Sequence, residues 1–135
     1  MLLHFLPIYS HIPIISFFRM YIVNVTEAFV TNKNAKGGTD TVFDNNRYLT
    51  CGVDSAIPLE LQMFLWGCVE RMPAPKDYLQ VFELSAAGPM QAITHSSEVP
   101  EYRMTYLIPS EKPITEKLYI IDDGDHSTML LAEEY

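Results

Sequence analysis

The residues of this chain best suited to chemistry fall within five consecutive positions near its C-terminus, and they are Asp122, Asp123, Asp125 and His126. Carboxylate oxygens are preferred ligands of hard cations such as Mg²⁺ and Ca²⁺, and a histidine beside carboxylates suits a transition metal. These four side chains are therefore candidate ligands of a weakly bound divalent cation. The alternative is an acidic turn exposed to solvent, because Gly124 comes too early for an EF-hand loop and the alternating acids are incomplete.

A hydrolytic site is a weaker interpretation of the same segment. Asp125, His126 and Ser127 are consecutive, but neighbouring residues of an extended chain point in alternating directions and do not align as a catalytic triad. The sequence contains no G-x-S-x-G elbow, P-loop or dinucleotide fingerprint. We identify no catalytic residue and no cofactor site, and we favour a protein that is not an enzyme.

The net charge limits the classes of partner. The chain carries a formal net charge of −8, and residues 43–135 hold 15 acidic and 6 basic side chains, a net charge of −9. Proteins that bind DNA or RNA usually draw on clustered Lys and Arg, so we expect no direct binding to nucleic acid. An acidic surface fits a basic protein partner or a cation. Two cysteines without a C-x-x-C pair indicate neither a disulfide framework nor a zinc site, and the cytoplasm is the expected compartment.

The first 42 residues differ from the rest. Residues 1–18 are largely apolar and hold no Lys, Arg, Asp or Glu. Pro7 and Pro13 would interrupt a membrane-spanning helix, and the segment lacks the charged start of a signal peptide. A third possibility is translated upstream sequence, because Lys36-Gly37-Gly38 can be encoded by a ribosome-binding site and Val42 by the start codon GUG. We expect a poorly structured extension over 1–42, possibly not native, and no membrane association unless residues 1–18 are truly translated.

The body of the chain, residues 43–135, is predicted to form a single domain. Arg47–Val53 alternates in the manner of a strand, and Asp54-Ser55 offers an N-cap for a helix over Leu59–Met72. That helix presents an apolar face at spacings of three and four residues. The residues of this face are Leu61, Phe64, Leu65, Cys68, Val69 and Met72.

Protein-contact candidates lie beside this helix and on one strand. Trp66 flanks the apolar stripe and is expected to be only partly covered, while Glu70 takes the opposite side of the helix. Tyr102 begins a predicted strand. Together with other tyrosines these residues can supply a contact surface, and the alternative is that the aromatic residues belong to the core.

Strand patterns account for the rest of the body. Turn signals separate them, including Gly88-Pro89 and Asp123-Gly124, and Leu79, Val81 and Phe82 are expected on buried surfaces. Over 127–134 a short helix competes with the last strand. The fold class is therefore α+β, one main helix packed on a mostly antiparallel sheet of about five or six strands. The predicted strands after the helix are 78–84, 90–95, 102–108, 117–121 and 128–132.

Several stretches of the body resemble a known family. FDNNRYLTCGV, IPLELQMFLWGCVE, DYLQVFELS, PEYRMTYLI and IDDGDHSTMLLAEEY are similar, in this order, to the bacterial "domain of unknown function 960" family over about residues 43–135. The resemblance implies a protein of low-GC Gram-positive bacteria, often carried by phages and mobile elements. Cys51 departs from the basic residue expected there. No activity or catalytic residue transfers from the family.

These observations lead to two functional expectations. The first is a non-enzymatic protein-binding module of a phage or mobile element, which can inhibit a host nucleic-acid enzyme by occupying its basic surface. The second is a divalent-metal-binding protein, or a metal-dependent enzyme, that uses the loop Asp122–His126. The identity of the partner, any substrate and the oligomeric state are left open by the sequence.

Overall fold

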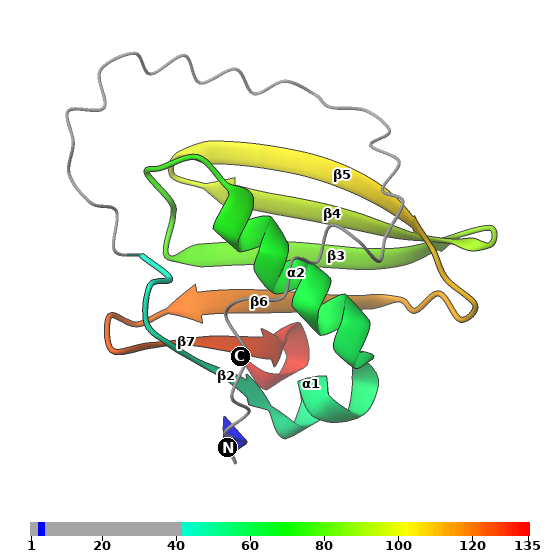
Figure 1. Ribbon diagram of the computed structural model, residues 1–135, viewed down its shortest axis with the longest axis horizontal. Coiled ribbons are helices and arrows are strands. Elements are labelled where there is room, and N and C mark those ends of the chain that lie inside the picture. Colours follow the sequence, from blue (N-terminus) through cyan, green and yellow to red (C-terminus); the bar gives the residue numbers. More distant parts are fainter. Residues whose placement is uncertain (1–2, 5–41) are drawn as a thin grey trace.

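The computed structural model describes residues 3–4 and 42–135, and in this part of the chain the dominant feature is a single mixed β-sheet with one face covered by a helix (Figure 1). The predicted extension over 1–42 lies, apart from residues 3, 4 and 42, outside this part. No helix in it has the length and apolar character needed to cross a membrane. The strands are β1 (Leu3–His4), β2 (Asn46–Thr50), β3 (Leu79–Ala87), β4 (Met90–Glu98), β5 (Glu101–Pro109), β6 (Glu116–Asp122) and β7 (His126–Leu131). The helices are α1 (Cys51–Ala56), α2 (Leu59–Arg71) and the short 3-10 helix η2 (Ala132–Glu134).

The sheet order is β1-β2-β7-β6-β3-β4-β5. All neighbouring strands pair antiparallel except β2 and β7, which run parallel. A parallel pair needs a crossover, and the whole segment from α1 to β6 provides it. The predicted α+β class, with one main helix on a mostly antiparallel sheet, is confirmed. Strands β2 to β7 make up the body of the sheet, and the two-residue β1 is added beside β2.

Helix α2 crosses the sheet diagonally and buries its apolar face against it (Figure 1). The predicted stripe is buried along its whole length, from Leu61 to Met72. Opposite it, the strands contribute Phe82, Ile93, Leu118 and other fully buried apolar side chains. The helix ends at Arg71, one residue before the predicted end, and Pro73 follows the C-cap Met72.

The start of the helical region differs from the prediction. The strand expected over Arg47–Val53 stops at Thr50, and Cys51 begins α1. The Thr50 hydroxyl accepts a hydrogen bond from the Val53 N–H at 3.3 Å, so Thr50 is the N-cap. The predicted cap Asp54-Ser55 lies inside α1 instead. Helix α2 begins after Pro58, which caps it without a side-chain hydrogen bond.

The inward side of β3 was also mispredicted in part. Phe82 is buried as expected, but Leu79 and Val81 lie half-buried on the opposite face, where no helix among the described residues covers them. The inward positions beside Phe82 are Gln80 and Leu84. A glutamine is tolerated there because its amide is fully engaged, donating to the Asp77 carbonyl at 2.7 Å and contacting His95 Nε2 at 2.6 Å.

The C-terminal segment forms a strand and then a short helix, so each alternative for 127–134 holds in part. Its carboxylate Glu134 returns to the N-terminus of α1. One oxygen, Oε2, accepts hydrogen bonds from the Thr50 hydroxyl at 2.6 Å and from the Leu131 N–H at 2.8 Å. The other accepts one from the Gly52 N–H at 3.2 Å. A side chain at position 52 would push this carboxylate away from these hydrogen bonds.

We expect the substitution Glu134→Gln to lower the free energy of unfolding by about 1–3 kcal/mol, because an amide supplies only one of the two acceptor oxygens. Urea unfolding followed by circular dichroism measures this change. Glu133→Gln is the matched control, since Glu133 is exposed and its substitution is expected to stay within about 0.5 kcal/mol. Equal effects of the two substitutions would contradict the capping role of Glu134.

Candidate functional site

The topology gathers four connections at one end of the sheet, on the left in Figure 1. Strands β2, β3, β5 and β7 begin there, and β4 and β6 end there. We call this end, with its five exposed carboxylates, the acidic end. Its residues are Asp44, Glu98, Glu101, Asp123 and Asp125.

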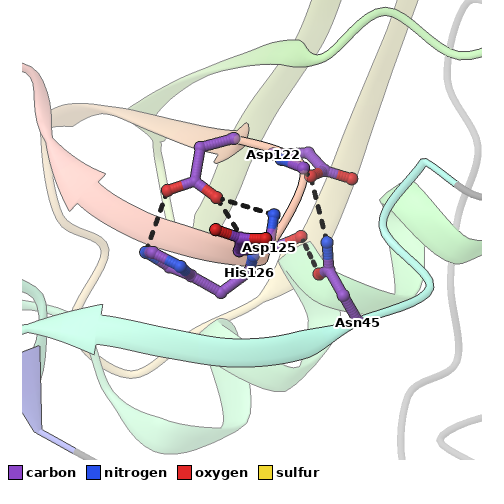
Figure 2. A network of polar contacts seen from close by, with 7 residues as sticks. Asn45, Asp122, Asp125 and His126 are labelled. Carbon is purple, nitrogen blue, oxygen red and sulfur yellow. Dashed lines mark hydrogen bonds and ion pairs between the residues drawn. The ribbon is translucent and has the colours of Figure 1, made fainter.

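Asp122, the first candidate metal ligand, is largely buried beneath the acidic end, with 8% of its surface exposed. Its Oδ2 accepts a hydrogen bond from the Phe43 N–H at 2.6 Å. Its Oδ1 accepts one from Asn45 Nδ2 at 3.0 Å and one from the Gly124 N–H at 2.7 Å. Figure 2 shows the Asn45 amide reaching across to this carboxylate. Asp122 therefore joins the segment before β2 to the β6–β7 turn.

The bond to Phe43 fixes an unusual backbone. Phe43 has a φ of 66°, in the left-handed region that aromatic residues rarely adopt, and its side chain is buried in the core. Asn45 completes the connection, because its Oδ1 accepts a hydrogen bond from the Ser127 hydroxyl at 2.6 Å. The chain entering β2 is thus held by side chains from both strands of the β6–β7 hairpin.

Asp123 and His126 pair with each other within the turn (Figure 2). Asp123 Oδ2 lies 3.1 Å from His126 Nε2, while Oδ1 accepts hydrogen bonds from the backbone N–H groups of Asp125 and His126. The pKa of Asp123 is lowered mainly because the His126 N–H donates to the charged form. The Asp125 carboxylate is exposed at the tip of the turn.

The side chains of Asp122, Asp123 and His126 therefore hold the turn through hydrogen bonds and an ion pair, and the Asp125 carboxylate is exposed. Within residues 3–4 and 42–135, no group of three or more His, Cys, Asp or Glu side chains is placed so that it could hold a metal ion. Both Asp122 oxygens are directed at N–H donors, and Asp123 faces the opposite way toward His126. The geometry gives the metal interpretation no support, and that interpretation stays an untested prediction.

Trp66 and Glu70, two of the protein-contact candidates, meet at Arg47 on β2. The Arg47 guanidinium lies over the Trp66 ring at 4.8 Å and pairs with Glu70 at 2.5 Å. Trp66 is only 2% exposed, so the expectation of a partly covered indole was wrong. The apolar periodicity of α2 could not reveal this, because the cation that covers the ring comes from a strand outside the helix. Glu70 is exposed.

Tyr102, the third contact candidate, is half-buried near the start of β5. Its ring meets the ring of His95 edge-on, with centroids 4.9 Å apart. His95 also stacks on Phe82 at 4.2 Å and is completely buried. Tyr102 therefore closes the outer edge of a buried group of polar and aromatic residues.

The protonation of His95 follows from its neighbours. Because the Gln80 Nε2 donates to the Asp77 carbonyl, the Gln80 Oε1 must accept, and His95 Nε2 must carry the proton. The other ring nitrogen, Nδ1, has no hydrogen-bond partner in the described part of the chain. Burial, with a smaller effect of the Arg71 charge, lowers the pKa of His95 to about 3.

Cys68 lies close to this group and is also held in its neutral form. Burial raises the pKa of its thiol to about 12, although the nearby Arg71 acts in the opposite direction. The thiolate is the nucleophilic form of cysteine, so this residue is unreactive at neutral pH. Burial likewise raises the pKa of Tyr106. The titratable groups under α2 are thus uncharged parts of the core.

We expect the free energy of unfolding to fall as the pH is lowered from about 6.5 toward about 3, because His95 binds a proton readily only in the unfolded chain. Its full contribution is present above the unfolded pKa, and the total loss is on the order of 4–5 kcal/mol. Urea unfolding at a series of pH values, compared with the variant His95→Gln, measures it. The slope should be shallower in that variant, and equal slopes in the two proteins would contradict this assignment.

We expect Asp122→Asn to destabilise the fold by about 1–3 kcal/mol, because one acceptor oxygen becomes a donor that faces another N–H. Chemical unfolding measures the loss, and Asp125→Asn is the control because its carboxylate is exposed. Calorimetric titration with Mn²⁺ and Mg²⁺ separates this role from metal binding. A saturable heat in the wild type that disappears in Asp122→Asn would support the metal interpretation.

Comparison with known proteins supplies a fold relative and a family. A crystal structure titled as a protein of unknown function from Enterococcus faecalis superposes with a TM-score of 0.63 at 23% sequence identity. The match covers 73% of this chain and 98% of that one, and at this identity it supports the fold alone. No curated protein matches the sequence.

The family match covers the whole sheet from β2 onward, together with both α-helices. Residues 46–134 match the model of a family described as "Staphylococcal protein of unknown function (DUF960)". This confirms the resemblance seen in the sequence. The protein belongs to the DUF960 family.

Proposed function

We propose that this protein is a non-enzymatic binding module whose acidic end contacts a basic protein partner. The observation that carries the proposal is the gathering of Asp44, Glu98, Glu101, Asp123 and Asp125, all exposed, at one end of the sheet. The loops that present them are held by buried hydrogen bonds. A preorganised charged surface of this kind loses little conformational entropy on binding.

Basic side chains are also present at this end, since Arg71 ends α2 and Lys76 lies between α2 and β3, but few of the five acids form an ion pair within the described ranges. Three ion pairs are found in the described part of the chain, and of the five exposed acids only Asp123 takes part, with His126. The two turns that carry the acids are rigid, since Asp77 accepts hydrogen bonds from the N–H groups of Glu98 and Val99 in one and Asp122 anchors the other. A complementary positive surface would be attracted over a distance of about one Debye length.

The partner class follows from this chemistry. Nucleic acid would be repelled, whereas the basic groove of a nucleic-acid enzyme would be attracted. Family membership is consistent with a bacterial origin. We propose that the protein acts in the cytoplasm, on behalf of a phage or mobile element, by occupying such a groove. Two cysteines without a C-x-x-C pair are compatible with that compartment.

We expect a captured partner to be released as the NaCl concentration rises, because screening weakens contacts between charged surfaces. The wild type, immobilised as bait, is compared with two variants that each lose four charges. The first, Asp44→Asn/Glu98→Gln/Glu101→Gln/Asp125→Asn, neutralises the acidic end and should lose at least about tenfold in affinity for the captured partner.

The matched control neutralises four exposed acids at the opposite end: Asp54→Asn, Glu60→Gln, Glu111→Gln and Glu133→Gln. It changes the net charge by the same amount and should retain the partner. Equal loss in both variants would show that total charge, not the acidic end, governs binding. Capture that does not depend on salt would contradict the proposal.

A further inference from the structure

Strand β5 forms one edge of the sheet, at the top in Figure 1. All nine of its residues pair with β4, from Glu101 opposite Glu98 to Pro109 opposite Met90. No other strand in the described ranges lies on its far side. Within the described ranges, the backbone N–H and C=O groups that point away from β4 therefore have no partner strand.

This edge carries few of the features that usually prevent strands from pairing. Natural edge strands are short, interrupted by bulges or prolines, or studded with charges. Strand β5 is long and its register with β4 is uninterrupted, with its only proline at the last position. Between Arg103 and Pro109 the sequence MTYLI is uncharged and rich in strand-forming residues. Such a segment is a template for strand addition.

The core is also incomplete at this edge. The side chains of Tyr102 and Met104 point to the face covered by α2, but both are only half-buried. Tyr106 and Ile108, further along the strand, are buried. A strand added beside β5 would cover the exposed parts of the first two side chains, so apolar burial would add to the backbone hydrogen bonds.

We propose that β5 pairs antiparallel with β5 of a second copy of this chain, forming one continuous sheet across a two-fold axis. In such a pair, residues directly opposite each other lie on the same face of the sheet. The allowed alignments are therefore those in which a residue that faces α2 in one copy lies opposite a residue that faces α2 in the other copy. The alignment that places Arg103 opposite Arg103 is unfavourable because like charges would face each other.

If all nine residues of β5 pair with the nine of the second copy, Thr105 lies on the two-fold axis. This alignment avoids placing Arg103 opposite Arg103. On the inward face, Met104 then faces Tyr106 of the second copy, and Tyr102 faces Ile108 of the second copy. On the outward face, Arg103 faces Leu107 of the second copy. Each half-buried side chain thereby gains an apolar neighbour of the kind that stabilises strand pairs.

Charge opposes the pairing of two copies in general, because residues 43–135 carry a net charge of −9, but this orientation keeps the repulsion small. Glu101 and its equivalent lie at opposite ends of the shared strand pair, separated by eight residue steps, or about 26 Å. This distance is several times the Debye length at physiological ionic strength. The two acidic ends therefore point away from each other, and both remain free for partners.

The inference does not rest on the proposed function. A monomer could still bind a basic partner through its acidic end, and a dimer could form without any such partner. The test uses the full chain, in analytical ultracentrifugation from about 1 to about 300 µM, a range that covers the dissociation constants of small interfaces. We expect twice the monomer mass at the upper concentrations, together with concentration-dependent protection of β5 amides in hydrogen exchange.

The variant Thr105→Lys places two ammonium groups opposite each other on the axis and should raise the dissociation constant of the dimer at least about fivefold. Thr94→Lys is the matched control. Thr94 pairs with Thr105, faces the same side of the sheet and is also half-buried, but it lies one strand in from the edge. It should leave the dissociation constant unchanged, and circular dichroism checks that both variants fold.

Three outcomes would overturn the proposal. The first is a monomer at all concentrations, and the second is a dimer that Thr105→Lys does not weaken. The third is equal weakening by both lysine variants, which would place the contact on the outward sheet face and not at the edge. None of these results bears on capture through the acidic end, so failure of one proposal is distinguishable from failure of the other.

Discussion

The structure depends on one geometrical constraint, namely that helix α2 is too short and too narrow to cover the whole sheet face on which it packs. Helix α2 has 13 residues and is therefore about 20 Å long. The six strands from β2 to β7 span about 24 Å across the sheet. A helix about 10 Å wide, lying diagonally, covers the middle of that face and leaves the ends of the strands without a helix above them. Apolar residues in the middle of the strands, such as Phe82 and Ile93, lie under the helix and are fully buried.

The uncovered ends of the sheet explain why so many polar side chains are buried. Three of the connections are each held by one carboxylate or amide whose polar atoms are engaged by backbone groups or neighbouring side chains. Asp77 holds the β4–β5 turn, Gln91 exchanges two hydrogen bonds with Ile114 in the β5–β6 loop, and Asp122 holds the entry to β2. A buried polar group with such partners stabilises a loop without leaving a group free for chemistry. Asp77 and Asp122 are thus enclosed by N–H donors, whereas Asp44, Glu101 and Asp125 are exposed to solvent.

Local patterns in the sequence predicted the local features of the fold. The apolar residues from Leu61 to Met72 predicted α2 because their spacing of three and four residues matches the helical repeat and places them on one buried face. Gly88-Pro89 correctly predicted the turn between β3 and β4. Features that depend on distant residues could not be predicted in this way. Thr50 became a helix cap because Glu134 fixes its hydroxyl, Trp66 was buried under Arg47, and Gln80 was buried because His95 and Asp77 satisfy its amide. Asp77 and Gln80, whose structural roles were not predicted, did leave a weak signal in the sequence. Asp77 immediately precedes the predicted strand, and Gln80 interrupts the apolar pattern of that strand.

The dependence of structure on residues distant in sequence also explains why the densest group of ionisable residues was a poor guide to the chemistry of the protein. Asp122 and Asp123 are adjacent, yet one is buried and accepts from Phe43, while the other is exposed and pairs with His126. Consecutive residues at a strand end diverge, so closeness in sequence does not bring their oxygens onto one cation. Residues that are remote in sequence, such as Asp44, Glu101 and Asp125, are instead brought to one end because the strands that carry them start there. Recognition by this protein is therefore expected to depend on which end or edge of the sheet a residue occupies, and not on any contiguous motif.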